Sequence, residues 1–164
     1  LFGAGHVGRA LILALAPLPF AVRWIDMRPE AFPAATPANV TCIHAADPVG
    51  EITAATAGTL VLAMTHSHAL DLDIAAAALA NPSVSFTGVI GSATKRARFA
   101  SRLKAMGIAP ASIARMACPV GLRSLKDKSP AVIAAGIAVE LLTAREAQAE
   151  RIKSTEEAVR ATLA

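Results

Sequence analysis

Short apolar runs alternate along this chain with longer segments whose apolar residues recur at helical spacing. Runs of this length that are rich in Val, Ile and Leu are typical of strands, and the longer segments are typical of helices. Strands are predicted at residues 20–26, 40–44, 59–64 and 83–90, after a two-residue stub at Leu1–Phe2. Helices are predicted at residues 7–16, 69–80, 94–106 and 131–144, with a helical turn at 111–116 and one helix within 46–57. This alternation predicts an α/β fold in which helices cover both faces of a parallel sheet, making three layers.

A glycine-rich turn, Gly3-Ala4-Gly5-His6-Val7-Gly8, separates the stub from the first helix. Three glycines at this spacing allow a tight turn, a close approach of the backbone to a phosphate and close helix–strand packing. Asp26 follows Gly8 by 18 residues and ends a predicted strand, the usual place for an acid that binds a ribose 2′-hydroxyl. Arg28 could instead admit a 2′-phosphate, or it is a solvated loop charge. The context predicts a Rossmann-like unit, with glycines that serve only packing as the alternative. Its candidate ligand contacts are Gly3, Gly5, His6, Gly8, Asp26 and Arg28.

Polar residues with reactive side chains follow the strand predicted at 59–64. The sequence there is Thr65-His66-Ser67-His68, with Asp71 shortly after. Open α/β sheets bind ligands beyond the carboxyl ends of their strands, so Thr65, His66 and His68 are candidate contacts. Two alternatives remain: a metal site that recruits Asp71, and a helix start capped by Ser67 or His68 with Asp71 in its first turn.

A third turn follows the strand predicted at 83–90 and reads Gly91-Ser92-Ala93-Thr94-Lys95-Arg96. Cations in the first turn of a helix oppose the helix dipole, so Lys95 and Arg96 do not serve helix stability there. We expect an anion to be held by Gly91, Ser92 and Lys95. The alternative is a solvated basic helix face.

The chain has two cysteines, and their spacing predicts neither a disulfide framework nor a zinc site. Cys118 ends a short apolar stretch and is either a sulfur ligand or an inert buried residue. Cys42 and His44 lie within a predicted strand and are expected in the core. Such sparse cysteine usage favours a reducing cytoplasm.

Charge and composition narrow the classes of partner. Lys and Arg total 16 against 12 acids, a balance of +4 that favours an anionic ligand. Aromatic residues make up only 4% and no Tyr occurs, so bases of a single-stranded nucleic acid have little to stack on. No apolar run approaches the roughly 18 residues that a membrane-spanning helix needs. We therefore expect neither nucleic acid nor a membrane as partner.

In their order along the chain, the motifs resemble the XdhC/CoxI family, over residues 1–142. The segments that carry the resemblance are 1–10, 26–28, 64–71, 88–99, 118–121 and 130–134. The resemblance implies a Rossmann-like domain over residues 1–145, followed by a C-terminal helix or tail over 146–164. It also implies that the family's N-terminal domain is missing from this sequence.

The resemblance implies a role in enzyme maturation rather than turnover. Members of this family bind the molybdenum cofactor, a pterin phosphate also called molybdopterin, and deliver it to xanthine dehydrogenase or a related molybdenum hydroxylase. They act as homodimers and work with a cysteine desulfurase. By this resemblance the glycine turn and Lys95 hold the phosphate, while His66, His68 and Cys118 face the pterin or its metal. Ser124 and Asp127 depart from the family by standing where glycine is expected.

Two other functions remain open at this stage. The glycine turn and Asp26 also suit an NAD(P)-dependent oxidoreductase, with NAD(P) as its cofactor. Because the chain has no Tyr to act with a Lys as proton relay, His66 or His68 would have to be the acid or base. A dimerisation module with a vestigial glycine turn is the third possibility.

Overall fold

The computed structural model describes residues 1–162 and contains one parallel sheet. Its four strands are β1 (Val22–Asp26), β2 (Val40–His44), β3 (Thr59–Ala63) and β4 (Val84–Val89). Strand β1 pairs with β2, and β3 pairs with β4, both in parallel. Phe2 joins the two pairs by bridging Ile25 and Ala63, and Ala117 bridges Gly88 on the far side of β4. The strand order is therefore β2, β1, Phe2, β3, β4 and Ala117.

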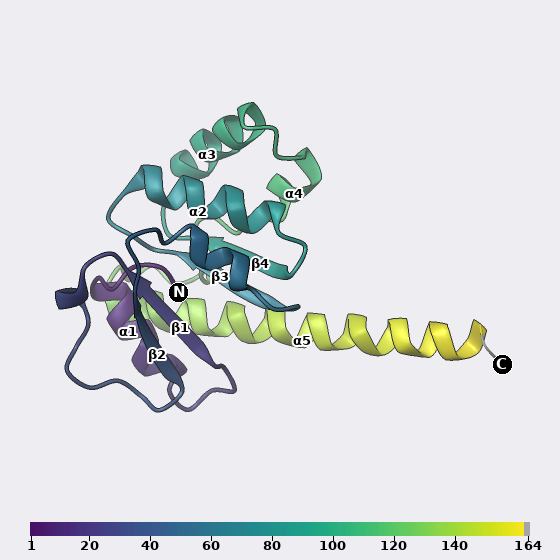
Figure 1. Ribbon diagram of the computed structural model, residues 1–164, viewed down its shortest axis with the longest axis horizontal. Coiled ribbons are helices and arrows are strands. Elements are labelled where there is room, and N and C mark those ends of the chain that lie inside the picture. The colour runs from purple at the N-terminus through teal and green to yellow at the C-terminus, as the bar shows by residue number, and fades with distance from the viewer. Residues whose placement is uncertain (163–164) are drawn as a thin grey trace.

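Helices cover both faces of this sheet, as Figure 1 shows. They are α1 (His6–Leu15), α2 (His68–Ala80), α3 (Ala93–Ala105), α4 (Pro110–Ala114) and α5 (Pro130–Thr162). Two short 3-10 helices, η1 (Pro29–Ala31) and η2 (Gly50–Ala54), lie in the connections that precede β2 and β3. Helices α1 and α5 pack together below the sheet, and α2 covers β3 and β4 from above with α3 and α4 beyond it. The predicted three-layer, Rossmann-like α/β fold is confirmed.

Side chains alternate between the two faces of the sheet, so the core has two parts. In β1, Trp24 packs with α1 and α5, whereas its neighbour Ile25 packs with the α2 side. In β3, Leu62 and Val61 divide in the same way. This is the period of two that a strand imposes when both of its faces are covered.

Local sequence signals account for the helix ends. The Ser67 side chain accepts a hydrogen bond from the N–H of Leu70, and that of Ser92 accepts one from Lys95, so both serines cap helices. Helix α3 ends before Gly107, whose φ of +86° suits glycine. The sequence expectations for these elements are met to within about two residues, the usual uncertainty of helix boundaries.

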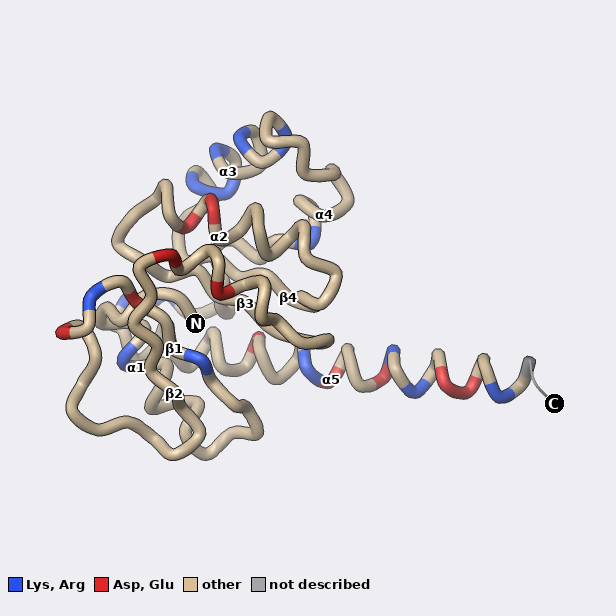
Figure 2. Tube along the Cα trace, in the orientation of Figure 1, with Lys and Arg blue, Asp and Glu red and all other residues tan. Residues whose placement is uncertain are grey.

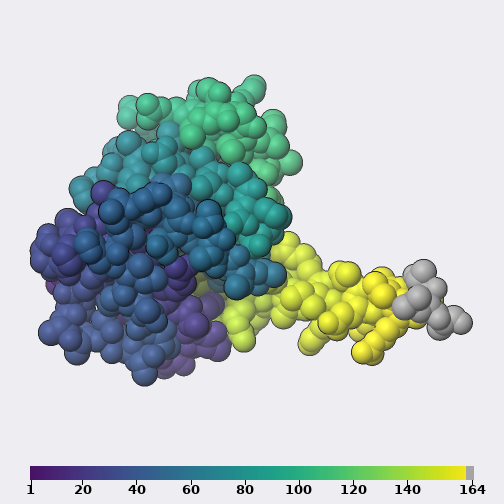
Figure 3. Space-filling view, in the orientation of Figure 1, coloured from purple at the N-terminus to yellow at the C-terminus, as the bar shows by residue number. Residues whose placement is uncertain are grey.

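Helix α5 is longer than the helix predicted at 131–144, because it continues without a break through Thr162. Its first half packs on α1, and the Gln148 side chain accepts a hydrogen bond from Ser85 at 3.1 Å. Beyond that contact the helix projects from the body, as the space-filling view shows (Figure 3). The predicted C-terminal helix is thus a continuation of α5, and residues 163–164 of that prediction lie outside the described residues. Among residues 1–162 no helix is both long and apolar enough to cross a membrane.

The expected burial of Cys42 and His44 is wrong. Both side chains are exposed, although their register partners on β1, Trp24 and Asp26, are buried. The reason is that β2 is an edge strand, and residues 28–39 before it form a proline-containing loop with only η1 in place of a covering helix.

Candidate functional site

All the turns predicted to carry function lie at one edge of the molecule. Each follows a strand or bridge of the parallel sheet, and parallel strands share one carboxyl edge. The turns are Gly3–Gly8, 26–28, 65–68, 91–95 and 118–121. The sheet therefore brings the predicted site residues to a common edge.

Packing accounts for two of the three motif glycines. Gly3 has a φ of +106°, and a Cβ there would lie 2.3 Å from the carbonyl oxygen of Met64. A Cβ on Gly8 would lie 2.4 Å from the carbonyl oxygen of Gly3, which also accepts the indole N–H of Trp24 at 3.0 Å. Gly5 is different, because a Cβ at that position would meet no atom within 4 Å. The space beside Gly5 is open to a ligand.

The first turn of α1 offers backbone donors beside that space. The helix begins at His6. Its N-cap residue, Gly5, has no side chain that could accept hydrogen bonds from the backbone N–H groups of the first turn. His6 and Gly5 are both exposed. The combination of open space, exposed N–H groups and the positive end of a helix dipole suits an anion.

Asp26 lies beneath the glycine turn and is only 7% exposed. Its Oδ2 accepts the backbone N–H of Ala4 at 2.7 Å, and its two oxygens accept Nε and Nη2 of Arg28 at 3.0 Å each. Burial alone would raise the pKa of Asp26, but the hydrogen bonds from the Arg28 side chain and the backbone of Ala4 outweigh it and hold the pKa below its ordinary value. Asp26 is an ionised group that supports the turn.

The turn after β3 divides into buried and exposed residues. Thr65 donates its backbone N–H and its hydroxyl to Oδ1 of Asp71, at 2.9 Å and 2.8 Å. Ser67 caps α2, so the capping interpretation of this segment holds for Ser67. The imidazoles of His66 and His68 are exposed and make no side-chain hydrogen bond within the part of the chain that the structure describes.

Lys95 is held by an ion pair rather than pointing freely to solvent. Its Nζ lies 2.6 Å from Oδ2 of the fully buried Asp71 and 2.9 Å from the carbonyl oxygen of Ile90. The same ammonium lies 5.0 Å from the centre of the Phe99 ring. An anion at Lys95 would therefore compete with Asp71. A Cβ on Gly91 would lie 2.5 Å from Cδ of Lys95, so glycine makes room for the lysine stem.

The rest of α3 contributes positive charge to the surface. Figure 2 shows that this helix carries Lys and Arg but no Asp or Glu. Arg96 is not purely solvated, because its guanidinium donates a hydrogen bond to the carbonyl of Met116. Arg98 and Arg102 are exposed, as the alternative interpretation of this helix expected.

Cys118 is fully buried, with Sγ 3.9 Å from the carbonyl oxygen of Ser92. Burial raises the pKa of its thiol, and the nearby cations of Lys95 and Arg96 oppose that shift without cancelling it. The group is a neutral thiol beneath the third turn, and in this conformation it does not face a ligand. Across residues 1–162, no three His, Cys, Asp or Glu side chains gather as metal ligands.

Two hollows differ in size and in position. The smaller, of about 10 Å³, lies at the carboxyl edge and contains the candidate residues Gly3, Asp26, Thr65 and His66. The larger, of about 680 Å³, lies at the amino ends of the strands between β1 and β3, below Leu1. Its wall is mainly apolar, and it contains none of the predicted site residues. We place the functional site at the carboxyl edge of the sheet, beside the smaller hollow, because the predicted site residues gather there.

Sequence reasoning missed Arg9, which braces the glycine turn. Its Nη2 donates to the carbonyl oxygen of Ala31 at 2.6 Å, and its Nε lies 3.4 Å from that of Ala4. Helical spacing places Arg9 on the exposed side of α1. That position is typical of a solvated charge, so the sequence contains no indication of this contact.

Comparison with known proteins identifies related chains. The sequence model of the XdhC Rossmann domain matches residues 1–141. Among solved structures, a xanthine dehydrogenase from Bacillus halodurans at 2.80 Å resolution is similar, with a TM-score of 0.71 and 22% sequence identity. That similarity covers 92% of this chain and 44% of the Bacillus chain, so this chain spans less than half of that relative. No curated protein matches.

Proposed function

This chain belongs to the XdhC Rossmann-domain family, and on that premise we propose that it binds the molybdenum cofactor and delivers it to xanthine dehydrogenase or a related molybdenum hydroxylase. Family membership supports an accessory role. The solved relative is itself described as a xanthine dehydrogenase, and its likeness supports the fold. The partners in the proposal are that client enzyme, a cysteine desulfurase and a second copy of this chain, in the cytoplasm.

The observation that carries the proposal is the open space beside Gly5 at the uncapped start of α1. A phosphate ester fits this place, because exposed backbone N–H groups and the helix dipole favour an anion. Gly5 admits the ligand closely without any side chain in the way. The exposed imidazoles of His66 and His68 lie at the same sheet edge and would face the larger part of the ligand.

Not every predicted contact fits the cofactor equally. Cys118 is buried and its thiol is neutral, so we assign it no bond to the metal. Lys95 supports the turn through Asp71 and would contact a phosphate only by sharing its charge. When bound, the cofactor supplies the metal centre that the client enzyme uses. The residues of this chain would bind the phosphate at the start of α1 and orient the pterin beside His66 and His68.

The contacts of Asp26, His66 and His68 do not support the alternative function of an NAD(P)-dependent oxidoreductase. It requires Asp26 as a ribose acceptor, and Asp26 is already bound by Ala4 and Arg28. It also requires an oriented acid or base, and the imidazoles of His66 and His68 make no side-chain hydrogen bond within residues 1–162. We therefore keep cofactor delivery as the proposed function.

The test is anaerobic calorimetric titration of this chain with molybdenum cofactor, comparing the native sequence with Gly5→Val. The new side chain would project into the open space, so the fold should survive while cofactor affinity falls by roughly tenfold or more. The control is Ala97→Val on the exposed face of α3, which should leave affinity unchanged. Absence of cofactor binding to the native chain, or binding unaffected by Gly5→Val, would contradict the proposal.

A further inference from the structure

We propose that Asp26 and Arg28 form a phosphate-selective subsite, which accepts a phosphomonoester at Arg28 and rejects a ligand that needs Asp26 to bind a ribose diol. This inference deepens the proposed function: it rests on the carboxyl edge of the sheet as the ligand site, and it names the ligand chemistry that Asp26 and Arg28 select at that edge. It concerns which ligands are preferred, not whether the cofactor is delivered.

The first observation is that Asp26 has no free acceptor position. An ionised carboxylate offers about four lone-pair directions. Oδ2 accepts Ala4 N–H at 2.7 Å and Arg28 Nη2 at 3.0 Å. Oδ1 accepts the Arg28 backbone N–H and Nε, both at 3.0 Å. A ribose hydroxyl could bind Asp26 only by displacing Arg28, which would break two charge-assisted hydrogen bonds.

The second observation concerns the opposite side of Arg28. The guanidinium has five N–H donors, and one from Nε and one from Nη2 point at Asp26. The remaining donors, including both on Nη1, make no hydrogen bond among the described residues, and the side chain is 44% exposed. The pair therefore presents donors and positive charge to the outside, which suits a phosphate oxygen rather than a hydroxyl that needs an acceptor.

Two further charges border this corner. Arg9 reaches the carbonyls of Ala4 and Ala31 and places a second guanidinium beside the same turn. Glu30, in η1, adds a negative charge near Arg28. The pKa of Arg28 is raised mainly by its hydrogen bond to Asp26, and the charge of Glu30 is a smaller cause of the same shift. An anion would gain from Arg28 and Arg9 and would be opposed by Glu30.

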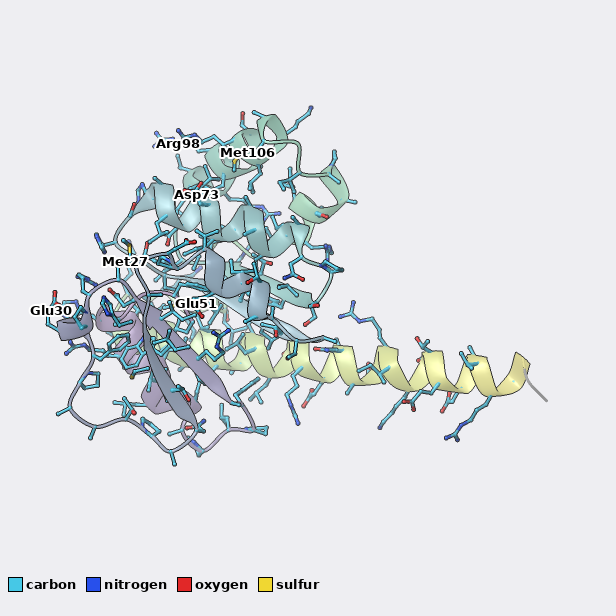
Figure 4. The ribbon with its side chains drawn as sticks, in the orientation of Figure 1. Met27, Glu30, Glu51, Asp73, Arg98 and Met106 are labelled. Atoms are coloured by element: carbon cyan, nitrogen blue, oxygen red, sulfur yellow. The ribbon has the colours of Figure 1, made fainter. Side chains whose placement is uncertain are left out.

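The position of the pair connects it to the rest of the site. Asp26 holds the amide of Ala4 within the glycine turn, and Asp26 and Met27 line the small hollow together with His66. Figure 4 shows Met27 and Glu30 on the segment that follows β1, and Arg98 on α3. A ligand phosphate on Arg28 would thus lie next to the glycine turn, while Arg98 offers a matched control for a change of charge elsewhere.

Two matched pairs of probes test the inference by calorimetric titration of the full chain. NADP and NAD differ only in a 2′-phosphate, and the phosphate ester of 6-hydroxymethylpterin differs from its parent pterin in the same way. We expect the phosphorylated member of at least one pair to bind roughly tenfold tighter or more, the size of a charge-assisted hydrogen bond. The pair that discriminates identifies whether the phosphate comes from a nucleotide or a pterin.

Substitutions then assign the discrimination to Arg28. Arg28→Ala should remove the preference for phosphate and, with Asp26 freed, should strengthen NAD binding relative to the native chain. Arg28→Lys should keep part of the preference, because the charge remains while the two-point contact is lost. Glu30→Gln should strengthen binding of the phosphorylated probe, and Arg98→Ala should leave the ratio unchanged.

Several results would overturn the inference. One is equal affinity for both members of each pair in the native chain, or no detectable binding of either phosphorylated probe. Another is a phosphate preference that persists in Arg28→Ala or, should that variant fail to fold, in Arg28→Lys at its native strength. Binding of the molybdenum cofactor is measured in a separate titration. The chain could therefore bind the cofactor without preferring the phosphorylated probes, or prefer those probes without binding the cofactor.

Discussion

The ammonium of Lys95 lies 2.6 Å from Oδ2 of Asp71, and this buried ion pair joins two turns whose residues are 24 positions apart. Asp71 belongs to the first turn of α2 and Lys95 to the first turn of α3. Oδ1 of Asp71 holds Thr65 at the same time. The pair therefore fixes the turn after β3 against the turn after β4, on both of which the candidate site depends.

We predict that Lys95→Met lowers the free energy of unfolding by about 3–5 kcal/mol, because Asp71 is left as an unpaired buried charge. Adding Asp71→Asn to that variant should recover part of the loss, since the amide is neutral and its oxygen can still accept from Thr65. Urea unfolding followed by circular dichroism measures both. A loss below about 1 kcal/mol in Lys95→Met, or no recovery in the double variant, would mean that the pair is not stabilising.

Asp26 should make the free energy of unfolding depend on pH in the acid range. Burial raises the pKa of Asp26, but its hydrogen bonds outweigh burial, so the pKa is lowered in the folded chain. The contribution of Asp26 to the free energy of unfolding is therefore complete above its unfolded pKa of about 3.9. That contribution is lost as pH falls through the lower, folded pKa. We expect the native chain to be more stable than Asp26→Asn near neutral pH, with the difference shrinking below about pH 4. Melting curves between pH 2.5 and 7 test this, with the exposed Asp73→Asn as control.

The two cysteines should differ strongly in reactivity. Cys42 is exposed on the edge strand, whereas Cys118 is buried and burial raises the pKa of its thiol. A thiol reagent such as Ellman's should modify Cys42 in the native chain and Cys118 only after unfolding. Cys42→Ser should abolish the fast reaction and Cys118→Ser should preserve it. Rapid labelling of Cys118 in the folded protein would show that the third turn opens to solvent.

The large cavity below Leu1 should accept a strand. The backbone nitrogen of Leu1 donates to the carbonyl of Arg23 at 2.9 Å, and the cavity continues from it between β1 and β3.

We predict that four apolar residues added before Leu1 raise the melting temperature by several degrees, given that 1 kcal/mol corresponds to about 2–4 °C at this size. They would extend the hydrogen-bond ladder and bury apolar surface. A Gly-Ser extension of equal length adds backbone but no apolar side chains to fill the cavity, so it should give a smaller gain. Equal melting temperatures for the two extensions would contradict strand addition.

The amino-acid sequence by itself determined the fold class and most element positions. Apolar runs located β2 and β3, and Ser67 was a predicted helix cap, because these signals act between residues a few positions apart. The sequence also placed the candidate turns at one edge, since parallel strands leave no other arrangement. It failed for Cys42, because burial of β2 depends on whether another element covers it.

Tertiary structure decided what the site residues can do. Lys95 and Asp26 were both predicted to contact a ligand, and no local pattern indicates that Asp71 and Arg28 respectively bind them. Cys118 was placed at the right edge, but its burial depends on the turn before α3 folding over it. Charge neutralisation and burial depend on distances between segments far apart in sequence, whereas secondary structure depends on near neighbours. That physical difference is why the chain revealed its strands and turns, and why only the folded structure revealed which of their side chains remain free to bind.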